Sequence, residues 1–134
     1  MQWDDSANGG FTTATSAWLA VNPNYKQINA AQEEADPDSV YNYTRRMIAL
    51  RAKTPAFVYG DYKDLDPQHP QIFVYTRVLG PERYLVIHNS AQPIAYTLPN
   101  GETAGTLTID NYTGDEANAS TLHLKGWESR IYKQ

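Results

Sequence analysis

The hydrophobic and polar positions divide the chain into three stretches with different patterns. The first, residues 1–28, follows neither a helical nor a strand period, and its Trp3 and Trp18 stand among Gly, Asn, Thr and Ser residues. Long stretches without a period inside compact domains usually line a binding site or are disordered. The pattern therefore predicts a long, irregular loop at the N-terminus.

Residues 29–55 carry the signals of two helices. Asn29 and Gln32 have the spacing of a capping box and predict a short polar helix over AAQEEA. A longer helix is predicted to start at Asp36 and Pro37, because Asp caps helices well and Pro is tolerated at the first helical position.

The longer helix has one apolar face. Its members recur every three or four positions: Val40, Tyr43, Met47, Ile48 and Leu50. Pro55 disfavours a helical conformation at Thr54, so the helix is predicted to end near Lys53. Such a face, at ~1.5–3 kcal/mol for each apolar side chain buried, is stabilising only where a partner surface accepts it.

Residues 56–134 change to a strand pattern. Turn signals separate short segments rich in Val, Ile, Thr and Tyr: AFVYGDYKDL, QIFVYTRVL, RYLVIHN, PIAYTL, GTLTIDNY, STLHLK and WESRIYK. The clearest hairpin joins QIFVYTRVL to RYLVIHNS through Leu79-Gly80-Pro81-Glu82. Short strands without intervening helices predict a mainly β fold, an antiparallel Greek-key β-sandwich preceded by the long loop and one amphipathic helix. The change in pattern divides the chain into residues 1–55 and residues 56–134.

The composition excludes several classes of partner. The net charge is −4 and the 11 Lys and Arg residues are scattered, so we expect no nucleic-acid partner. The sequence has neither a long apolar run nor a basic, apolar leader, so we expect no membrane partner. It has no cysteine, which excludes disulfides and cysteine-based zinc sites and fits a cytoplasmic protein of bacterial type.

Candidate metal ligands are widely separated. His69, His88 and His123 lie in different predicted turns or strands, and a shared metal would need them to converge with a fourth ligand. We therefore expect no metal site and no cofactor.

Four motifs in the first half of the chain resemble a known family. MQWDDSANGGFTT, VNPNYKQIN, DPDSVYNYTRRMIALR and TPAFVYGDY occur in the order and spacing found in the α-glucosidases of glycoside hydrolase family 13. The most similar branch contains oligo-1,6-glucosidases, dextran glucosidases, trehalose-6-phosphate hydrolases and sucrose isomerases. The resemblance covers residues 1–62, whereas residues 63–134 match in strand pattern and in the closing GWESRIYK.

The resemblance implies that the chain is the C-terminal part of a longer hydrolase. In this family a (β/α)₈ barrel carries the chemistry and a C-terminal β-sandwich packs against it. Residues 1–55 would then be the terminal loop and last helix of the barrel, residues 56–134 the C-terminal domain, and Met1 an internal residue. The parent would hydrolyse short α-linked gluco-oligosaccharides with retention, by a two-carboxylate mechanism.

No catalytic residue is expected in this chain. The family's nucleophilic Asp, its acid/base Glu and its further Asp all lie upstream of the tryptophan motif. A substitute pair would need two carboxylates about 5–9 Å apart, one with its pKa raised by burial. We expect the candidate carboxylates to be ordinary solvated groups: Asp4, Asp5, Glu33, Glu34, Asp61, Asp64, Asp66, Asp110, Asp115, Glu116 and Glu128.

Trp3 and Asp4 are the substrate-binding candidates, in the context of the full enzyme. Trp3 could stack on a sugar ring, because aromatic faces complement the C–H faces of pyranoses, or it could hold the loop to the barrel. Asp4, the polar member of the motif, would help to shape the pocket entrance. Trp18 and Trp127 are expected in a core or an interface.

Two functional hypotheses remain. In the first, the chain is a non-catalytic C-terminal fragment that braces the catalytic barrel in cis. Alone, it is expected to self-associate through the exposed helix face or to be partly disordered over residues 1–28. In the second, it is a free-standing carbohydrate-binding module whose sandwich presents aromatic side chains: Tyr59, Tyr62, Tyr75, Tyr84, Tyr96 and Tyr112.

Overall fold

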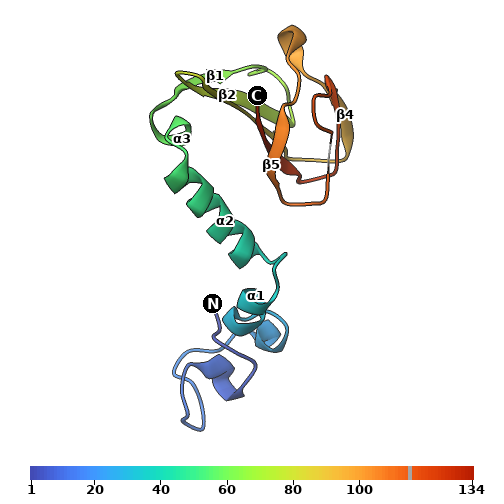
Figure 1. The fold of residues 1–134 in the computed structure, drawn as a ribbon. Helices are drawn as coiled ribbons and strands as arrows, with labels where there is room; N and C mark the ends of the chain where they lie inside the picture. The colour runs from blue at the N-terminus through green and yellow to red at the C-terminus, as the bar shows by residue number, and fades with distance from the viewer. Residues whose placement is uncertain (115) are drawn as a thin grey trace. The chain divides into compact units, whose positions relative to one another are not determined.

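The computed structural model of the chain describes residues 1–114 and 116–134. The chain forms two compact units, Met1–Ile48 and Ala49–Gln134. The division falls within helix α2 (Val40–Lys53). Loops and short helices make up the first unit, whereas the strands labelled in Figure 1 belong to the second.

The first unit begins with the predicted irregular loop, which contains two 3₁₀ turns. Its regular elements before α2 are η1 (Ala7–Gly10), η2 (Pro23–Lys26) and α1 (Ala30–Ala35). The predicted cap of α1 is confirmed, since the Asn29 side chain accepts a hydrogen bond of 3.0 Å from the Gln32 backbone N–H. Asn29 is fully buried, and its own amide group also donates to the Tyr25 carbonyl.

The predicted start of the longer helix is wrong by three residues. Helix α2 begins at Val40, and the Ser39 hydroxyl accepts a hydrogen bond of 3.1 Å from the Asn42 N–H, as a capping side chain does. Asp36 instead accepts from the Asp38 N–H at 2.9 Å, which forms a local turn. Asp and Ser favour turns as well as caps, so two capping residues in one short segment left the start ambiguous.

The predicted end of α2 at Lys53 is confirmed, but its apolar face is only partly covered in this chain, with Tyr43, Met47 and Leu50 half-buried. Asn42 is the only buried residue of the helix, while Val40 is 76% exposed and Ile48 is 65% exposed. The apolar period therefore predicts the helix correctly, but the side chains on its apolar face do not form a core within this chain.

The second unit contains a further helical turn and the strands. The structure assigns α3 (Ala56–Tyr59), β1 (Asp61–Asp64), β2 (Ile72–Leu79), β3 (Glu82–Asn89), β4 (Ile94–Thr97), η3 (Pro99–Gly101), β5 (Thr106–Asp110), β6 (Thr121–Leu124) and β7 (Ser129–Lys133). The prediction of a strand over AFVY is wrong. Pro55 starts a helical turn there, closed by a 2.9 Å bond from the Tyr59 N–H to the Pro55 carbonyl.

The strands form two antiparallel sheets. The larger sheet has the order β1-β2-β3-β7-β5, and the smaller pairs β4 with β6. The predicted hairpin is confirmed: Leu79 pairs with Glu82 across a two-residue turn. Gly80 has φ +55°, and Pro81 cannot adopt a positive φ, so the pair suits a type II′ turn. After β3 the chain crosses between the sheets at every connection, which ties the two together.

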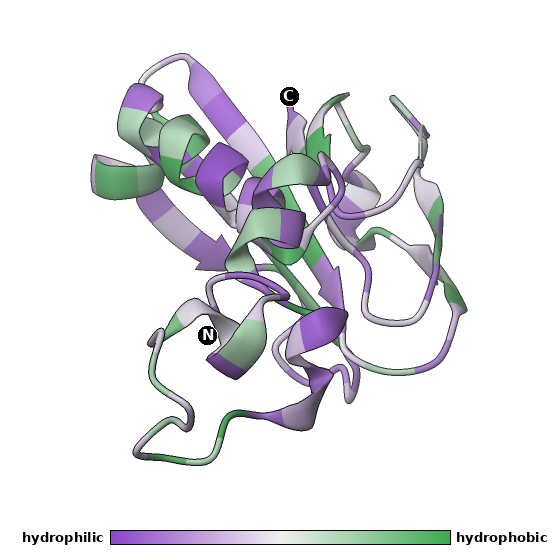
Figure 2. Cartoon of the chain, turned by 90° about the horizontal axis from the view of Figure 1, so that it is seen from below, coloured by the Kyte–Doolittle hydropathy of each residue, from purple (hydrophilic) through white to green (hydrophobic). Residues whose placement is uncertain are grey.

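The core of the second unit lies between the two sheets. Val74, Leu85 and Ile87 of the larger sheet and Leu122 and Leu124 of the smaller sheet belong to one buried cluster. In Figure 2 the strands carry both hydrophobic (green) and hydrophilic (purple) residues along their length. This mixture is expected for strands that bury one face and expose the other. The mainly β fold, an antiparallel β-sandwich preceded by a long loop and one main helix, is confirmed.

Candidate functional site

The predicted site residues Trp3 and Asp4 lie in an ordered turn that is bonded to α1. The N–H groups of Ala30 and Ala31, the first two of the helix, donate to the carbonyls of Gln2 (2.9 Å) and Trp3 (3.0 Å). Helix N-termini leave such N–H groups without partners inside the helix, so the opening segment satisfies them. The backbone of Trp3 is thereby fixed while its side chain stays 63% exposed.

Two glycines allow the turn to close on itself. The Trp3 N–H donates to the Gly9 carbonyl at 2.9 Å, and Gly9 and Gly10 have φ values of +61° and +73°. A Cβ atom at Gly10 would lie 2.9 Å from the Asp4 carboxylate oxygens. The glycines are therefore required both for the left-handed backbone and for the space that Asp4 occupies.

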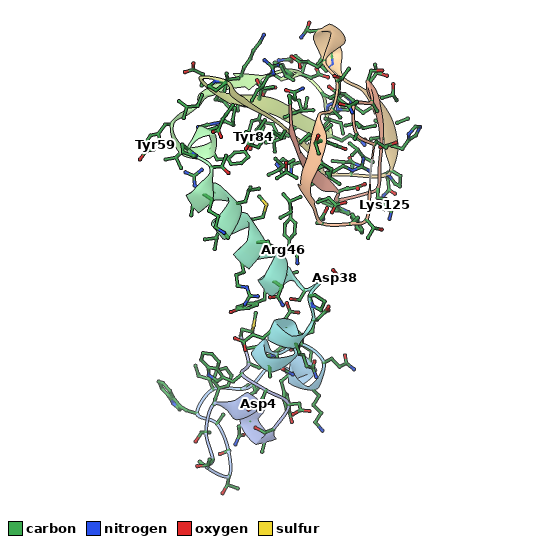
Figure 3. The ribbon with its side chains drawn as sticks, viewed as in Figure 1. Asp4, Asp38, Arg46, Tyr59, Tyr84 and Lys125 are labelled. Carbon is green, nitrogen blue, oxygen red and sulfur yellow. The ribbon has the colours of Figure 1, made fainter. Side chains whose placement is uncertain are left out.

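Asp4 is held in its ionised form. Its carboxylate accepts hydrogen bonds from the hydroxyl and the backbone N–H of Ser6, the latter at 2.9 Å. These bonds, the hydroxyl first, hold the pKa of Asp4 below its ordinary value. Asp4 is labelled in Figure 3, within the first unit. The ionised carboxylate of Asp4 can accept hydrogen bonds, and the exposed indole of Trp3 offers a stacking face. An ionised carboxylate cannot act as a general acid at neutral pH.

A hollow of about 600 Å³ lies on the same unit, in the loop that follows η1. It is lined mainly by apolar side chains, among them Phe11, Trp18, Leu19 and Val21. Trp18 is 96% exposed, so its placement in a core of this chain is wrong, and the interface alternative remains a prediction. Trp127, in the second unit, is 69% exposed, so the prediction of a core position is wrong for it as well, and its interface role also remains a prediction.

The carboxylates of the second unit include a buried network that the sequence interpretation missed. Glu128 is fully buried and accepts 2.8 Å and 2.6 Å hydrogen bonds from the Arg130 Nε and the Lys125 N–H. Arg130 also donates to Glu116 at 2.7 Å and to the Tyr132 hydroxyl at 3.1 Å. The expectation of a solvated Glu128 is therefore wrong.

The protonation states in this network follow from its hydrogen bonds. Burial alone would lower the pKa of Arg130, but its bonds to Glu128, Tyr132 and Glu116 outweigh that effect and raise the pKa. Burial likewise opposes ionisation of Glu116, but bonds from His123 and Arg130 lower its pKa. The shifts of Arg130 and Glu116 both favour the charged form, so this ion pair fixes structure rather than supplying a proton donor. Asp115, also among the candidate carboxylates, lies outside the described residues.

The three histidines have separate structural roles. The His69 Nδ1 accepts from the N–H groups of Gln71 and Ile72, His88 contacts the Ser129 hydroxyl at 2.7 Å, and His123 pairs with Glu116 at 2.8 Å. Within residues 1–114 and 116–134, no group of three or more His, Asp or Glu side chains could hold a metal ion.

The outer face of the larger sheet carries an aromatic cluster, defined here as Tyr62, Phe73, Tyr75 and His88. Ring centroids of Phe73 and Tyr75 lie 5.0 Å apart, and those of Tyr62 and Tyr75 lie 5.2 Å apart. The Phe73 and His88 rings stack at 6.0 Å and 17°. Tyr62 and Phe73 are exposed, so part of this rigid ring surface faces solvent.

The other tyrosines proposed as a binding surface do not join this cluster. Tyr84 is buried and packs on Phe57 of α3 at 4.6 Å, and Tyr96 is buried with its hydroxyl donating to Asp66 at 2.9 Å. Tyr59, the last residue of α3 and labelled in Figure 3, is exposed. Tyr112 lies under the Lys125 ammonium at 4.9 Å.

Comparison with family models matches the two halves of the chain to two different domains. Residues 1–60 match the model "Alpha amylase, catalytic domain", and residues 72–131 match "Alpha-amylase SusG C-terminal domain".

Among the described residues, no helix has both the length and the apolar character that a membrane span requires.

Several similar proteins align with almost the full length of this chain. The oligo-1,6-glucosidase of Parageobacillus thermoglucosidasius is 44% identical over 99% of this chain, and that of Bacillus cereus is 37% identical over 99%. The crystal structure of the trehalulose synthase MutB from Pseudomonas mesoacidophila MX-45 superposes with a TM-score of 0.89 at 47% identity over 98% of this chain. The chain spans 24% of the length of each of these proteins.

Proposed function

Because the chain belongs to the C-terminal region of glycoside hydrolase family 13 α-glucosidases, we propose that it is the non-catalytic part that braces such an enzyme's barrel. The enzyme would hydrolyse short α-linked gluco-oligosaccharides with retention, through two carboxylates that lie upstream of the segment this chain matches. Its cytoplasmic location is part of the proposal and is supported by the absence of cysteine.

The observation that carries the proposal is the composition of the first unit's interior. All of residues 1–48 are described, and none of their apolar side chains is buried. The buried side chains are polar, namely Gln2, Asn29, Ser39 and Asn42. Large apolar side chains are exposed instead: Phe11, Trp18, Leu19, Ile28, Val40 and Ile48. An exposed apolar surface of this extent marks a contact site, and we propose that the barrel covers it in cis.

The direct test compares the chain alone with a chimera. The chimera joins the chain to the upstream part of the Parageobacillus thermoglucosidasius oligo-1,6-glucosidase. We expect the chain alone not to hydrolyse p-nitrophenyl α-D-glucopyranoside, and the chimera to hydrolyse it. Hydrolysis by the purified chain alone, abolished by substitution of one of its own carboxylates, would contradict the proposal.

We further propose that Trp3 and Asp4 belong to the rim of the barrel's active site. The fixed backbone and exposed indole of Trp3, together with the ionised carboxylate of Asp4, support this proposal, because such groups can stack on and bond to a sugar. In the chimera, Trp3→Ala should raise KM more than it lowers kcat. Trp127→Ala, an exposed tryptophan of the second unit, is the matched control and should change neither. If the two substitutions changed KM and kcat equally, the proposal that Trp3 belongs to the site would be contradicted.

A domain boundary between residues 55 and 56 is also proposed. Residues 56–134 contain all of the buried apolar side chains among the described residues, which supports folding as one domain. A chain of residues 56–134 should therefore unfold cooperatively on its own. A non-cooperative urea transition would contradict this boundary.

The second candidate, a carbohydrate-binding module, is favoured by the aromatic cluster on the outer face of the larger sheet. The rings are held against one another by paired strands, and Tyr62 donates a hydrogen bond to Asp64 at 3.2 Å. Titration of the chain with maltose and isomaltose, followed by amide chemical shifts, tests this function. Saturable shifts near Phe73 that Phe73→Ala removes and Tyr112→Ala leaves unchanged would favour the module over the bracing role.

Self-association through the exposed face of α2 remains a proposal for the chain in isolation. Light scattering after size exclusion should show a dimer or larger species that Val40→Ser together with Ile48→Ser converts to a monomer. A monomeric wild-type chain would contradict it.

A further inference from the structure

The chain contains two Asn-Gly pairs, Asn8-Gly9 and Asn100-Gly101. In such a pair the glycine backbone nitrogen can attack the Asn side-chain carbonyl carbon, because glycine has no side chain to hinder the approach. The new bond joins that nitrogen to Cγ, and the bond from Cγ to the side-chain nitrogen breaks. Ammonia leaves with the proton of the attacking amide. Water then opens the cyclic imide at either carbonyl and yields aspartate or isoaspartate.

The two pairs have nearly the same backbone conformation. Asn8 has φ 60° and ψ 20°, and Asn100 has φ 58° and ψ 23°. Both residues must rotate away from this turn geometry before the glycine nitrogen can reach Cγ. The local sequence and the dihedral angles therefore favour neither pair, and any difference in reactivity must come from the surroundings.

At Asn8-Gly9, hydrogen bonds restrain both the Asn8 side-chain amide and the Gly9 backbone nitrogen. The Asn8 amide group donates to the carbonyl of Ala14 at 2.8 Å and to that of Thr12 at 3.4 Å. The attacking nitrogen of Gly9 donates to the Ser6 carbonyl at 2.9 Å. Gly9 is buried, and a Cβ atom there would meet Val21 at 3.1 Å. Rotation at Asn8 thus requires several hydrogen bonds to break in a packed turn.

The surroundings of Asn100-Gly101 are open. Both residues are exposed at the tip of η3, and no atom lies within 4 Å of a Cβ placed on Gly101. Across the part of the chain that the structure describes, no residue accepts a hydrogen bond from the Asn100 side chain. One bond, from the Glu102 N–H to the Pro99 carbonyl at 3.1 Å, closes the turn.

We propose that Asn100 is a site of spontaneous deamidation and that the fold protects Asn8 from the same reaction. Water is the only co-reactant, and no enzyme is needed. The proposal does not depend on the function proposed above, because it rests on the turn between β4 and β5 and on the turn at η1.

The product at position 100 alters a connection within the sandwich. Aspartate or isoaspartate places a new carboxylate two residues before Glu102, which pairs with Arg83 of β3 at 2.5 Å. Isoaspartate also lengthens the backbone by one carbon in a turn that needs a left-handed residue. The modified chain should therefore have a looser β4–β5 turn and one more negative charge.

The experiment compares both positions in the same molecule. The full chain is incubated at pH 7.5 and at pH 9, both folded and in concentrated guanidinium chloride. Peptides that contain residues 8 and 100 are then quantified by mass spectrometry for the one-dalton increase, with fragmentation that distinguishes isoaspartate. The peptide of residue 8 is an internal control with the same Asn-Gly pair.

In the folded chain, deamidation at Asn100 should exceed that at Asn8 by about ten-fold or more, since hydrogen bonds of ordinary strength must break first at Asn8. In guanidinium chloride the two rates should converge, and both should rise with pH. The proposal is overturned by a folded-state ratio near or below one, by a ratio that denaturation leaves unchanged, or by a folded Asn100 that does not react while the denatured one does.

Discussion

The two units of the chain differ in whether they bury apolar side chains. In residues 49–134 the interior is mainly apolar, with Leu85, Ile87 and Leu122 fully buried between two sheets, although it also contains the ion pair of Glu128 and Arg130. In residues 1–48 the buried side chains are polar and their hydrogen bonds are made within the unit. Hydrogen bonds contribute about 0.5–1.5 kcal/mol each, and they do not replace a hydrophobic core. The first unit therefore has a defined shape without an independent source of stability.

The largest expected effect comes from the buried ion pair of the second unit. Glu128→Gln removes the fully buried one of the two carboxylates that pair with Arg130 and leaves Glu116 as its charged partner, so it should lower the free energy of unfolding by up to about 3–5 kcal/mol. Glu34→Gln, on the exposed side of α1, is the control and should change it by less than about 0.5 kcal/mol. Urea denaturation followed by circular dichroism measures both. Similar values for the two variants would show that the network at Arg130 is not structural.

The stability cost of the same Ile→Ala substitution can be compared between the two units at Ile87 and Ile48. Ile87→Ala removes a fully buried side chain and should cost about 2–5 kcal/mol. Ile48→Ala makes the same chemical change at a 65% exposed position and should cost less than about 0.5 kcal/mol in the chain alone, measured at a concentration at which the chain is monomeric. The same Ile48→Ala change in the chimera should be destabilising, because the barrel then covers that side chain. An unchanged stability there would mean that α2 meets no partner.

Within the first unit, the side chain with the largest expected effect is Asn42. Its amide group donates to the carbonyls of Glu33 (2.9 Å), Glu34 (3.1 Å) and Asp36 (2.7 Å), which links α2 to the end of α1. Asn42→Ala should lower the local stability of this junction by about 1–3 kcal/mol. Amide hydrogen exchange of residues 33–42 measures it. Thr44→Ala, on an exposed position of α2, should leave that exchange unchanged, and equal effects would deny Asn42 this role.

The smallest expected effect is a pH dependence of the second unit. Burial lowers the pKa of His88 below its ordinary value of about 6.5. The unfolded chain therefore binds this proton more readily, so the stability contributed by neutral His88 is present above about pH 6.5 and is lost as the pH falls through and below it. The urea midpoint should be lower at pH 5.5 than at pH 7.5, and His88→Gln should reduce the difference. A midpoint that rises on acidification would contradict the sign.

Some of these features follow from the sequence and others do not. The Gly80-Pro81 turn, the Asn29 cap and the end of α2 at Lys53 depend on local chemistry, and all three are confirmed. The start of α2 does not follow, because Asp36 and Ser39 both offer a capping oxygen and the choice depends on Asn42. The four apolar residues AFVY fit a strand or a helical turn equally well.

The candidate site separates in the same way. The motif places Trp3 and Asp4 in one turn, and the Gly9-Gly10 pair that shapes this turn is visible in the sequence. The burial of Glu128 is a tertiary property, because it requires Arg130, Glu116 and the Lys125 backbone together. Its one signal was an acidic and a basic residue two positions apart at the start of the last strand, where alternate side chains share a face. The exposure of the α2 apolar face cannot be read from its period, because the period is the same for a core and for an interface.

Amide hydrogen exchange of the 134-residue chain alone tests the central claim most directly. The claim is that residues 1–48 rely on a partner surface, whereas residues 49–134 hold their own core. Amides of η1, α1 and the first turn of α2 should exchange by local opening at least about a hundred-fold faster than those of β2, β3 and β7, a difference of roughly 3 kcal/mol. Equal protection of the two units in the isolated chain would contradict the account.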